Sequence, residues 1–530
     1  MLDRYGPWTA LALVAALAAA GCTPGADLLP TPDPTSEVHT ELTYLVDGYG
    51  RYLTVHGVNL GGSTKTPFTA PYDAEPEQVY FNDLEFSYVG RPFPLEEADH
   101  WFGVINSLGF NAVRFILNWE AIEPEARGKY NTEYLDYVDE MVAAAERNGI
   151  YVLMDMHQDM FSRHVFTRMN ERPYETLADA GIDDADVVAA SVMTMVPPFT
   201  DTMRGDGAPR WAVQAALPHK QMDSPHYGDP HIMGQLDLEL VLALVEVIQL
   251  LTGAEDGEIE VPEWASYVLQ NLPAESYGMD ETTNMLPWSM WGINNGTSVD
   301  QEMCWAAFLA GSDVFPTREI EGQNVQDYLQ EAYAGAWRQV AMRAAEHNNV
   351  IGYDLMNEPN GIYLALTLAA VVGQTGMMDG VEQLLMDLLG EELGPTFYTV
   401  FAGLSLIPPD NEPETMAAWG LDDADLLAVA GLNIGHDANY LEPFYSRIGQ
   451  AIQDEDPGAV IWIESSSGLE VVTGGGVGGG VMEVNMVHPA RIDQLVYAPH
   501  WYPDIYPMVG LVREPREFDV EEIRYREYGD

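Results

Sequence analysis

The sequence predicts an α/β fold built on a (β/α)8 TIM barrel, of which six strands can be recognised. The first observation is a recurrence. In four places an amphipathic helical pattern ends in Gly, Asn or Asp and is followed within a few residues by an apolar, β-branched run. This alternation implies a parallel sheet with helices outside it. The second observation is that each predicted strand ends in polar or aromatic residues, at the edge where a barrel carries its active site.

The predicted elements follow one another along the chain. Residues 51–60, "RYLTVHGVNL", form the first strand, and residues 493–502, "DQLVYAPHWY", form the sixth. The four helix–strand units between them are residues 100–117, 138–157, 340–358 and 447–464. After the sixth strand, the chain offers no apolar run that ends in a glutamate. A closed barrel needs eight strands, so we expect this barrel to be incomplete, with its seventh and eighth strands missing at the C-terminus.

The barrel domain is predicted to cover residues 41–530 and to contain two long insertions. They lie at about 165–322 and 361–440, after the third and fourth strands. Because both follow strand ends, we expect them to overhang the active-site face. The second insertion contains "LALTLAAVVG" and "MMDGVEQLLMDLLG", helical patterns with broad apolar faces. Packing of these helices against one another is the simpler interpretation, and a wall for a lipid is the alternative.

The N-terminus is typical of a bacterial signal peptide. An apolar run of residues 9–20, too short to span a bilayer, leads into Gly21 and Cys22. This ending resembles the lipobox of bacterial lipoproteins, in which the cysteine is lipidated, although Ala19 stands where that pattern prefers leucine. Residues 23–40 are expected to be a Pro-rich tether. The predicted location is therefore outside the cell or on the bacterial cell envelope, with any membrane contact made through a lipid anchor.

The charge balance excludes some partners. The chain of 530 residues holds 83 acidic and 23 basic residues, a formal net charge of −60. Nucleic acids and anionic membrane surfaces would repel such a protein. Neither is an expected partner.

Polar and aromatic residues gather at all six predicted strand ends. A lone His or Arg in such a place is more often structural, but six consecutive strand ends with this property indicate an active site. The residues are Asn59, Arg114, Asn118, Trp119, His157, Gln158, Asp159, Asn357, Glu358, Glu464, His500 and Tyr502.

Four segments resemble glycoside hydrolase family 5: "NAVRFILNWEAIEPEARGKYN", "VLMDMHQDMFSRH", "GYDLMNEPN" and "YAPHWYPD". The "HQD" sequence and the lysine of "GVNLGGSTKTPF" resemble the endoglycoceramidase-related branch of that family. The resemblance implies retaining hydrolysis of β-glycosidic bonds, with glycolipids as one substrate class. It also implies that this reaction needs no metal or cofactor. Retaining enzymes place two carboxyl groups on either side of the scissile bond, one as acid/base and one as nucleophile.

The resemblance also implies a role for each residue. Glu358 would be the acid/base, and Asn357 would bind the sugar 2-hydroxyl group. Arg114 would support the nucleophile. Lys65, His157 and Asp159 would line the sugar subsite, while His500 and Tyr502 would lie on the nucleophile side.

The nucleophile is not identified. Glu464 ends the fifth recognisable strand, whereas the family's nucleophile lies on the seventh, so a secondary subsite or structural role is favoured for it. Glu527, in "REYGD", matches the family's Glu-aromatic-Gly pattern, but the residues before it are too charged for an inner strand. We therefore expect little turnover by the chain as given. The alternatives are an endo-β-glucanase or mannanase, and a non-catalytic carbohydrate-binding surface protein.

Overall fold

The computed structural model describes residues 35–65, 67–69, 86–165, 205–218, 299–363, 366–367, 370, 424–466, 488–489 and 491–500. The predicted leader with Cys22, the candidate residues Tyr502 and Glu527, and large parts of both predicted insertions lie outside the described residues.

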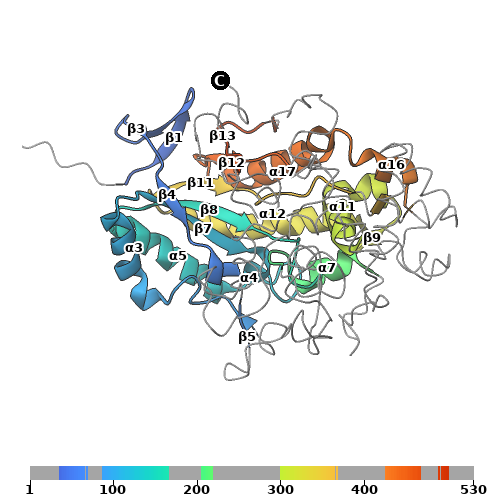
Figure 1. The fold of residues 1–530 in the computed structure, drawn as a ribbon, viewed down its shortest axis with the longest axis horizontal. Coiled ribbons are helices and arrows are strands. Elements are labelled where there is room, and N and C mark those ends of the chain that lie inside the picture. The colour runs from blue at the N-terminus through green and yellow to red at the C-terminus, as the bar shows by residue number, and fades with distance from the viewer. Residues whose placement is uncertain are drawn as a thin grey trace, which may run out of the picture.

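A six-stranded parallel sheet lies at the centre of the described structure (Figure 1). Its strands are neighbours in the order β4, β7, β8, β11, β12 and β13, which is also their order along the chain. Their bounds are Gly57–Asn59, Ala112–Asn118, Tyr151–His157, Val350–Asp354, Ile461–Ile463 and Leu495–Tyr497. Every pairing within this sheet is parallel. The predicted α/β fold with six parallel strands is therefore confirmed.

A helix precedes each of the four middle strands. These helices are α3 (Ala98–Ser107), α5 (Thr132–Arg147), α12 (Val325–Ala344) and α17 (Glu442–Gln453). Contacts between α3 and α5, α5 and α12, and α12 and α17 join them into one row beside the sheet (Figure 1). The seven residues of β8 are all buried, as expected for a parallel strand covered on both faces. The four predicted helix–strand units are confirmed.

Helix α5 shows how the sequence determines where these helices begin and end. The side chain of Asn131 accepts a hydrogen bond from the backbone N–H of Tyr134, 3.2 Å away, and so caps the first turn. Gly149, with φ of 70°, follows the helix in the left-handed region that glycine adopts readily. Between these ends the buried residues recur at helical spacing, including Leu135, Val138, Met141, Val142 and Ala145.

Shorter elements surround this framework. β5 pairs with β6, and β9 with β10, in antiparallel two-stranded sheets. Helices α7 and α11 lie within the first predicted insertion, and α16 lies within the second. Among the described residues, no helix is long and apolar enough to cross a membrane. The bounds are η1 Gly62–Lys65, β5 Phe68–Thr69, β6 Phe86–Ser87, η2 Leu95–Glu97, α4 Trp119–Ile122, α7 Arg210–Ala216, α11 Val299–Val314, β9 Glu319–Ile320, β10 Gln323–Asn324, α16 Leu426–Gly431 and η6 Asp437–Leu441.

A small antiparallel sheet covers the beginnings of the parallel strands. It consists of β1 (Val38–Glu41), β2 (Tyr44–Asp47) and β3 (Tyr52–Leu53). A separate apolar cluster joins it to the parallel sheet, formed by Val38, Ala112, Tyr151, Leu153 and Ile351. Residues 38–40, which the sequence assigned to the tether, therefore belong to β1. The Pro-rich composition of the preceding residues does not extend to them.

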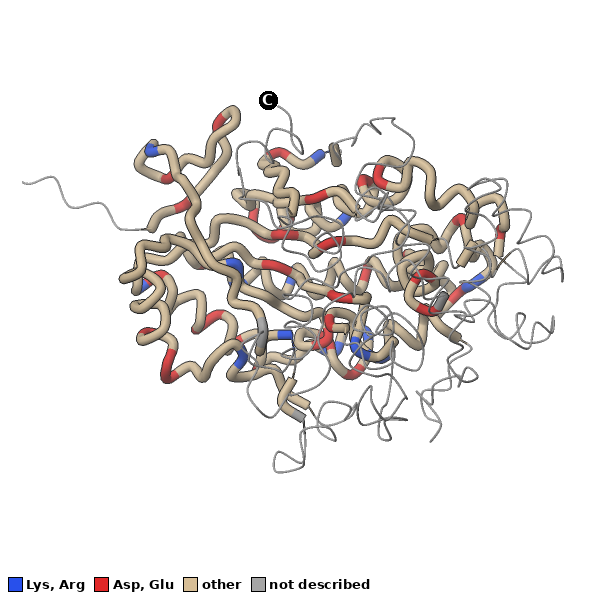
Figure 2. The backbone as a smooth tube through the Cα atoms, in the orientation of Figure 1, with Lys and Arg blue, Asp and Glu red and all other residues tan. Residues whose placement is uncertain are grey.

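Acidic residues outnumber basic ones along most of the described backbone (Figure 2). Despite this scarcity of cations, Arg114 and Arg163 both lie near the carboxyl ends of the central strands. Their side chains are only 13% and 3% exposed. Buried charges are retained when they are paired, so this edge of the sheet should hold matched acidic groups.

Replacement of Gly352 by alanine is expected to destabilise the fold by about 3 kcal/mol. Gly352 lies in β11 with φ of 146°, and an added Cβ would lie 2.3 Å from Trp462 Nε1 and 2.4 Å from the carbonyl oxygen of Val460. Gly431→Ala is the matched control, because no described atom lies within 4 Å of its Cβ position at the end of α16. Urea denaturation of both variants measures the difference. Equal unfolding midpoints would show that β11 and β12 can shift apart at no cost.

Candidate active site

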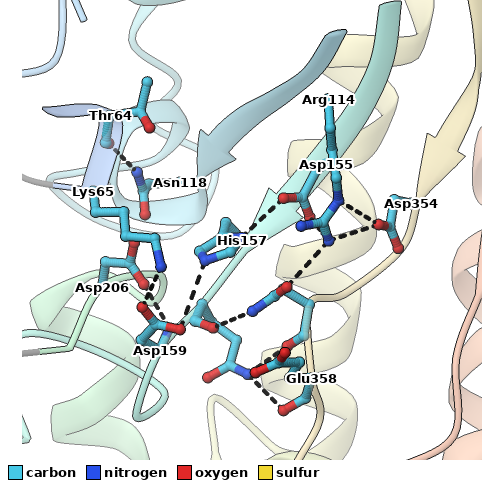
Figure 3. A network of polar contacts seen from close by, with 12 residues as sticks. Thr64, Lys65, Arg114, Asn118, Asp155, His157, Asp159, Asp206, Asp354 and Glu358 are labelled. Carbon is cyan, nitrogen blue, oxygen red and sulfur yellow. Dashed lines mark hydrogen bonds and ion pairs between the residues drawn. The ribbon is translucent and has the colours of Figure 1, made fainter. Parts of the chain in front are cut away.

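The carboxyl ends of the central strands bring most of the predicted site residues to one edge of the sheet (Figure 3). Three groups of contacts occupy this edge: an ion cluster around Arg114, a pair of glutamates beside His500, and a second ion cluster around Lys65. The predicted residues that meet there are Lys65, Arg114, His157, Asp159, Asn357, Glu358, Glu464 and His500. The neighbouring Asn118 donates instead to the carbonyl oxygen of Thr64, at 2.8 Å.

Arg114 neutralises two aspartates on adjacent strands. Asp155 of β8 and Asp354 of β11 are directly opposite in the strand register. Like charges in that arrangement repel each other. The Arg114 guanidinium lies between them, with its Nη2 3.0 Å from Asp155 Oδ1 and 2.7 Å from Asp354 Oδ2. Burial disfavours the charge on Asp155, but Arg114 and His157 outweigh this effect and lower its pKa. Asp354 keeps a raised pKa because burial dominates over the attraction of Arg114.

The side chain of Asn357 is fixed between β8 and the Arg114 cluster. Its Oδ1 accepts a hydrogen bond from Arg114 Nη2 at 3.1 Å, and its Nδ2 donates to the carbonyl oxygen of Gln158 at 3.1 Å. The Gln158 side chain returns this contact by donating to the carbonyl oxygens of Asn357 at 2.5 Å and Glu358 at 3.0 Å. The backbone that carries Glu358 is thereby tied to the end of the neighbouring strand.

Glu358 follows β11 in a conformation that a non-glycine residue rarely adopts, with φ of 42°. Its backbone N–H donates to Glu464 Oε1 at 2.7 Å, which helps to hold this conformation. On its side chain, Oε1 lies 2.6 Å from His500 Nδ1, and His500 Nε2 lies 3.6 Å from Glu464 Oε1. Strained backbone that the surroundings fix in this way is concentrated at functional sites.

Glu464 is buried beside other carboxyl groups. Burial, followed by the charges of Asp354 and Glu358, raises its pKa well above the ordinary value. The Tyr445 hydroxyl group donates to its carbonyl oxygen at 3.0 Å and fixes the end of β12. A glutamate in these surroundings favours the neutral form.

Lys65 and Asp159 form the centre of the second ion cluster. Lys65 Nζ lies 2.6 Å from Asp159 Oδ2, and the lysine side chain is 22% exposed. His157 bonds through Nδ1 to Asp155 Oδ2 at 2.9 Å, and its Nε2 lies 3.6 Å from Asp159 Oδ1. Burial and Lys65 lower the pKa of His157, but Asp155 and Asp159 outweigh them and raise it to about 9.

Three ligand-type side chains here have the spacing of a metal site. His157, Asp159 and Asp206 each place one donor atom within 4.8 Å of the others. The Lys65 ammonium group already neutralises Asp159, so the cluster carries its own cation. A divalent metal bound beside Lys65 would meet electrostatic repulsion.

Glu120 anchors the loop that follows β8. Its carboxylate accepts hydrogen bonds from Arg163 Nε at 2.7 Å and from the Tyr88 hydroxyl group at 3.0 Å, and it lies 2.5 Å from His164 Nε2. Burial raises the pKa of Glu120, but Arg163 and His164 outweigh it and lower the pKa to about 2. The loop from Gln158 to His164, which carries Asp159, is therefore held at both ends.

Sequence reasoning missed several of these groups. Asp155 and Asp354 are isolated charges inside apolar runs, a pattern that could have marked them as inward-facing partners of Arg114. Glu120 lies in the segment "NWEAIEP", where its distance from other polar residues matches no motif. Asp206 lies in the first insertion, and only the structure brings it to Asp159.

Comparisons with known proteins agree with the motifs. A model of the cellulase family (glycosyl hydrolase family 5) matches residues 72–190. The chain is 27% identical over 322 residues to a glucosylceramidase of Aspergillus fumigatus, covering 59% of this chain and 31% of that enzyme. The chain is thus similar to enzymes of glycosyl hydrolase family 5. It is also 32% identical over 130 residues to an endoglycoceramidase of Hydra vulgaris, covering 24% of this chain and 22% of that enzyme.

The resemblance to family 5 and to its glycolipid-acting relatives is thereby confirmed. Among solved structures, sterylglucosidase 1 of Cryptococcus neoformans matches with a TM-score of 0.49 and 18% identity, over 91% of this chain and 61% of that one. The chain spans about a third of the length of the curated glucosylceramidases that it matches.

Proposed function

We propose that the protein hydrolyses β-glycosides that carry a lipid aglycone, with Glu358 as the acid/base residue. The observation that carries this proposal is the position of Glu358. It follows the parallel strand β11 with strained backbone, is bonded to His500, and lies beside Asn357. In this proposal the six parallel strands are the first six of a (β/α)8 barrel, whose active site lies at this edge.

The acid/base role follows from what surrounds Glu358. Its side chain is almost completely buried, at 8% exposed, and its Oε1 contacts a ring nitrogen of His500 that can share a proton with it. A general acid must protonate the oxygen of the leaving group and then take a proton from water. A carboxyl group that is fixed at the carboxyl edge of the sheet and paired with an imidazole suits both steps.

Glu464 takes a supporting role in this mechanism. A nucleophile must be ionised, whereas burial and the neighbouring carboxyl groups favour the neutral form of Glu464. Its Oε1 is also engaged by the backbone N–H of Glu358. We therefore assign Glu464 to positioning of the acid/base residue and leave the nucleophile unassigned, since Glu527 lies outside the described residues.

Lys65, His157 and Asp159 suit the recognition of sugar hydroxyl groups. The ammonium and imidazolium groups donate hydrogen bonds, and the carboxylate accepts them. Pairing of Lys65 with Asp159 fixes both side chains before a sugar arrives. Such pre-organisation reduces the entropy cost of binding.

The lipid aglycone is supported by the names of the relatives, which include a glucosylceramidase and an endoglycoceramidase. The leader-like residues 1–22 support a further proposal, that the protein acts outside the cytoplasm, either secreted or anchored through Cys22.

The substrate class is tested by incubating the purified protein with glucosylceramide, a steryl β-glucoside and cellohexaose. We expect kcat/KM on at least one lipid glycoside to exceed that on cellohexaose by about 100-fold, because the aglycone contributes binding energy. Preferential release of short oligosaccharides from cellohexaose or mannohexaose would instead indicate an endo-β-glucanase or mannanase. Glycan binding without turnover of an activated aryl glucoside would indicate a carbohydrate-binding protein.

A further inference from the structure

Among the described residues, three buried side-chain atoms near Lys65 make no hydrogen bond, although two of them, His157 Nε2 and Asp159 Oδ1, lie 3.6 Å apart as an ion pair. The three atoms are His157 Nε2, Asp159 Oδ1 and Asp206 Oδ2. The three side chains are 5%, 1% and 0% exposed, and each places a ligand atom within 4.8 Å of the other two. A buried polar atom without a hydrogen bond is unfavourable, so three of them in one place require an explanation.

Asp206 reaches this cluster because two glycines allow a close approach of the backbone. Its N–H donates to the carbonyl oxygen of Asp159 at 2.9 Å, and its Oδ1 accepts from the Asp159 N–H at 2.5 Å. A Cβ on Gly205 would lie 2.5 Å from the carbonyl oxygen of Asp159, and one on Gly207 would lie 2.6 Å from Gln158 Cβ. The close approach at Gly205 and Gly207 thus places one oxygen of Asp206 against Asp159 (Figure 3). The other oxygen makes no hydrogen bond to the described residues.

The chemistry of the three atoms fits a hydroxyl group. Because the His157 ring is bonded to Asp155 and has a raised pKa, its Nε2 carries a proton that it can donate. Asp159 Oδ1 belongs to a carboxylate whose pKa is lowered: burial opposes the lowering, but Lys65 outweighs it. This oxygen therefore accepts. A hydroxyl group accepts from one neighbour and donates to another, which matches this mixture of donor and acceptor.

We propose that Asp206 is a substrate-binding residue that, together with His157 and Asp159, receives one hydroxyl group of the sugar. This inference rests on the proposed glycosidase function and adds the member of the sugar subsite that the first insertion supplies. Burial and the charge of Asp159 raise the pKa of Asp206 to about 7, so near neutral pH its free oxygen can accept a hydrogen bond or donate one.

The test compares wild type with Asp206→Asn and Asp206→Ala on 4-nitrophenyl 1-thio-β-D-glucoside and its 3-, 4- and 6-deoxy analogues. These thioglycosides resist hydrolysis, so calorimetric titration reports binding whether or not the protein is catalytic. We expect each variant to bind the parent compound about 10- to 100-fold more weakly than wild type. For one deoxy analogue we expect the three proteins to bind equally, because the hydroxyl group that meets Asp206 is missing.

Asp206→Asn keeps an oxygen that can accept the hydrogen bond from the Asp159 N–H. If the alanine variant does not fold, the asparagine variant alone provides the test. Asp47→Asn, at another buried aspartate that bonds to backbone N–H groups, is the matched control and should leave binding unchanged. Equal binding of the parent compound by wild type and both Asp206 variants would overturn the inference, as would equal weakening on every analogue.

One outcome separates the inference from the proposed function. Binding that depends on Asp206, without turnover of an aryl β-glucoside by wild type, would support the subsite and reject the hydrolase. Absence of any binding by wild type would reject both. Stoichiometric binding of Mn²⁺ or Zn²⁺ that requires Asp206 and displaces the thioglucoside would show that the cluster is a metal site and overturn the inference.

Discussion

Replacement of Glu358 by glutamine should reduce the hydrolysis of glycosides with poor leaving groups by about 10³-fold. Lipid and alkyl glycosides need protonation of the leaving oxygen, and glutamine keeps the shape of the side chain without the proton. Dinitrophenyl β-glucoside needs little protonation, so the formation of its glycosyl intermediate should be slowed much less. The measurement is kcat/KM for both substrates in protein that turns over an aryl β-glucoside.

Azide sharpens this test, because it attacks a glycosyl intermediate without needing a base. Adding azide should accelerate turnover of the dinitrophenyl glucoside by the Glu358→Gln variant and have little effect on wild type. Glu346→Gln is the matched control, since Glu346 is exposed at the end of α12. If both substrates lose rate by the same factor and azide has no effect, the assignment of Glu358 as acid/base is wrong.

Replacement of Arg114 by methionine should destabilise the protein by about 3 to 5 kcal/mol at neutral pH, because removing one partner of a buried pair leaves an uncompensated charge. Arg114 is the cation between Asp155 and Asp354, which face each other across two strands. Arg147→Met is the control. Arg147 is 54% exposed and pairs with Asp99 at 3.3 Å, so it should cost at most about 1 kcal/mol.

The loss of stability in Arg114→Met should depend on pH. The folded protein lowers the pKa of Asp155 from its ordinary value of 3.8. The ion pair therefore stabilises the fold above about pH 4, and this contribution is lost as the pH falls through the lowered pKa. The difference in unfolding midpoint between wild type and Arg114→Met should be largest near pH 7 and shrink in acid. Adding Asp354→Asn to the variant should recover part of the loss, and no recovery would mean that Arg114 acts through packing.

The periodic parts of the fold could be predicted from sequence. Helical spacing followed by an apolar run is a local signal, and it located all four helix–strand units. Polar residues at strand ends then placed Glu358, Arg114, His157 and Asp159 on one edge, because parallel strands all end at the same side of a sheet.

Pairings between distant residues could not be predicted in this way. Asp155 and Asp354 lie in register only because β8 and β11 are neighbours, although 199 residues separate them. Asp206 lies 47 residues beyond Asp159 and is brought back by the close approach at Gly205 and Gly207. Neither the spacing nor the composition of those segments specifies the contact. The small β1–β3 sheet was missed because short antiparallel strands give a weak periodic signal.

The order of the central strands bears on how the chain folds during synthesis. Because each strand of the central sheet after β4 pairs with the central strand that precedes it along the chain, the sheet can grow from one end as the ribosome releases the chain. The β1–β3 sheet, in contrast, depends on a contact with a residue near the end of the described chain. Thr40 bonds through both its backbone N–H and its hydroxyl group to the side chain of Gln494, 454 residues later, at 2.5 and 2.8 Å. Closing so long a loop is slow, so β1, the first described strand, must wait until the residue just before β13 is in place before both of these bonds can form.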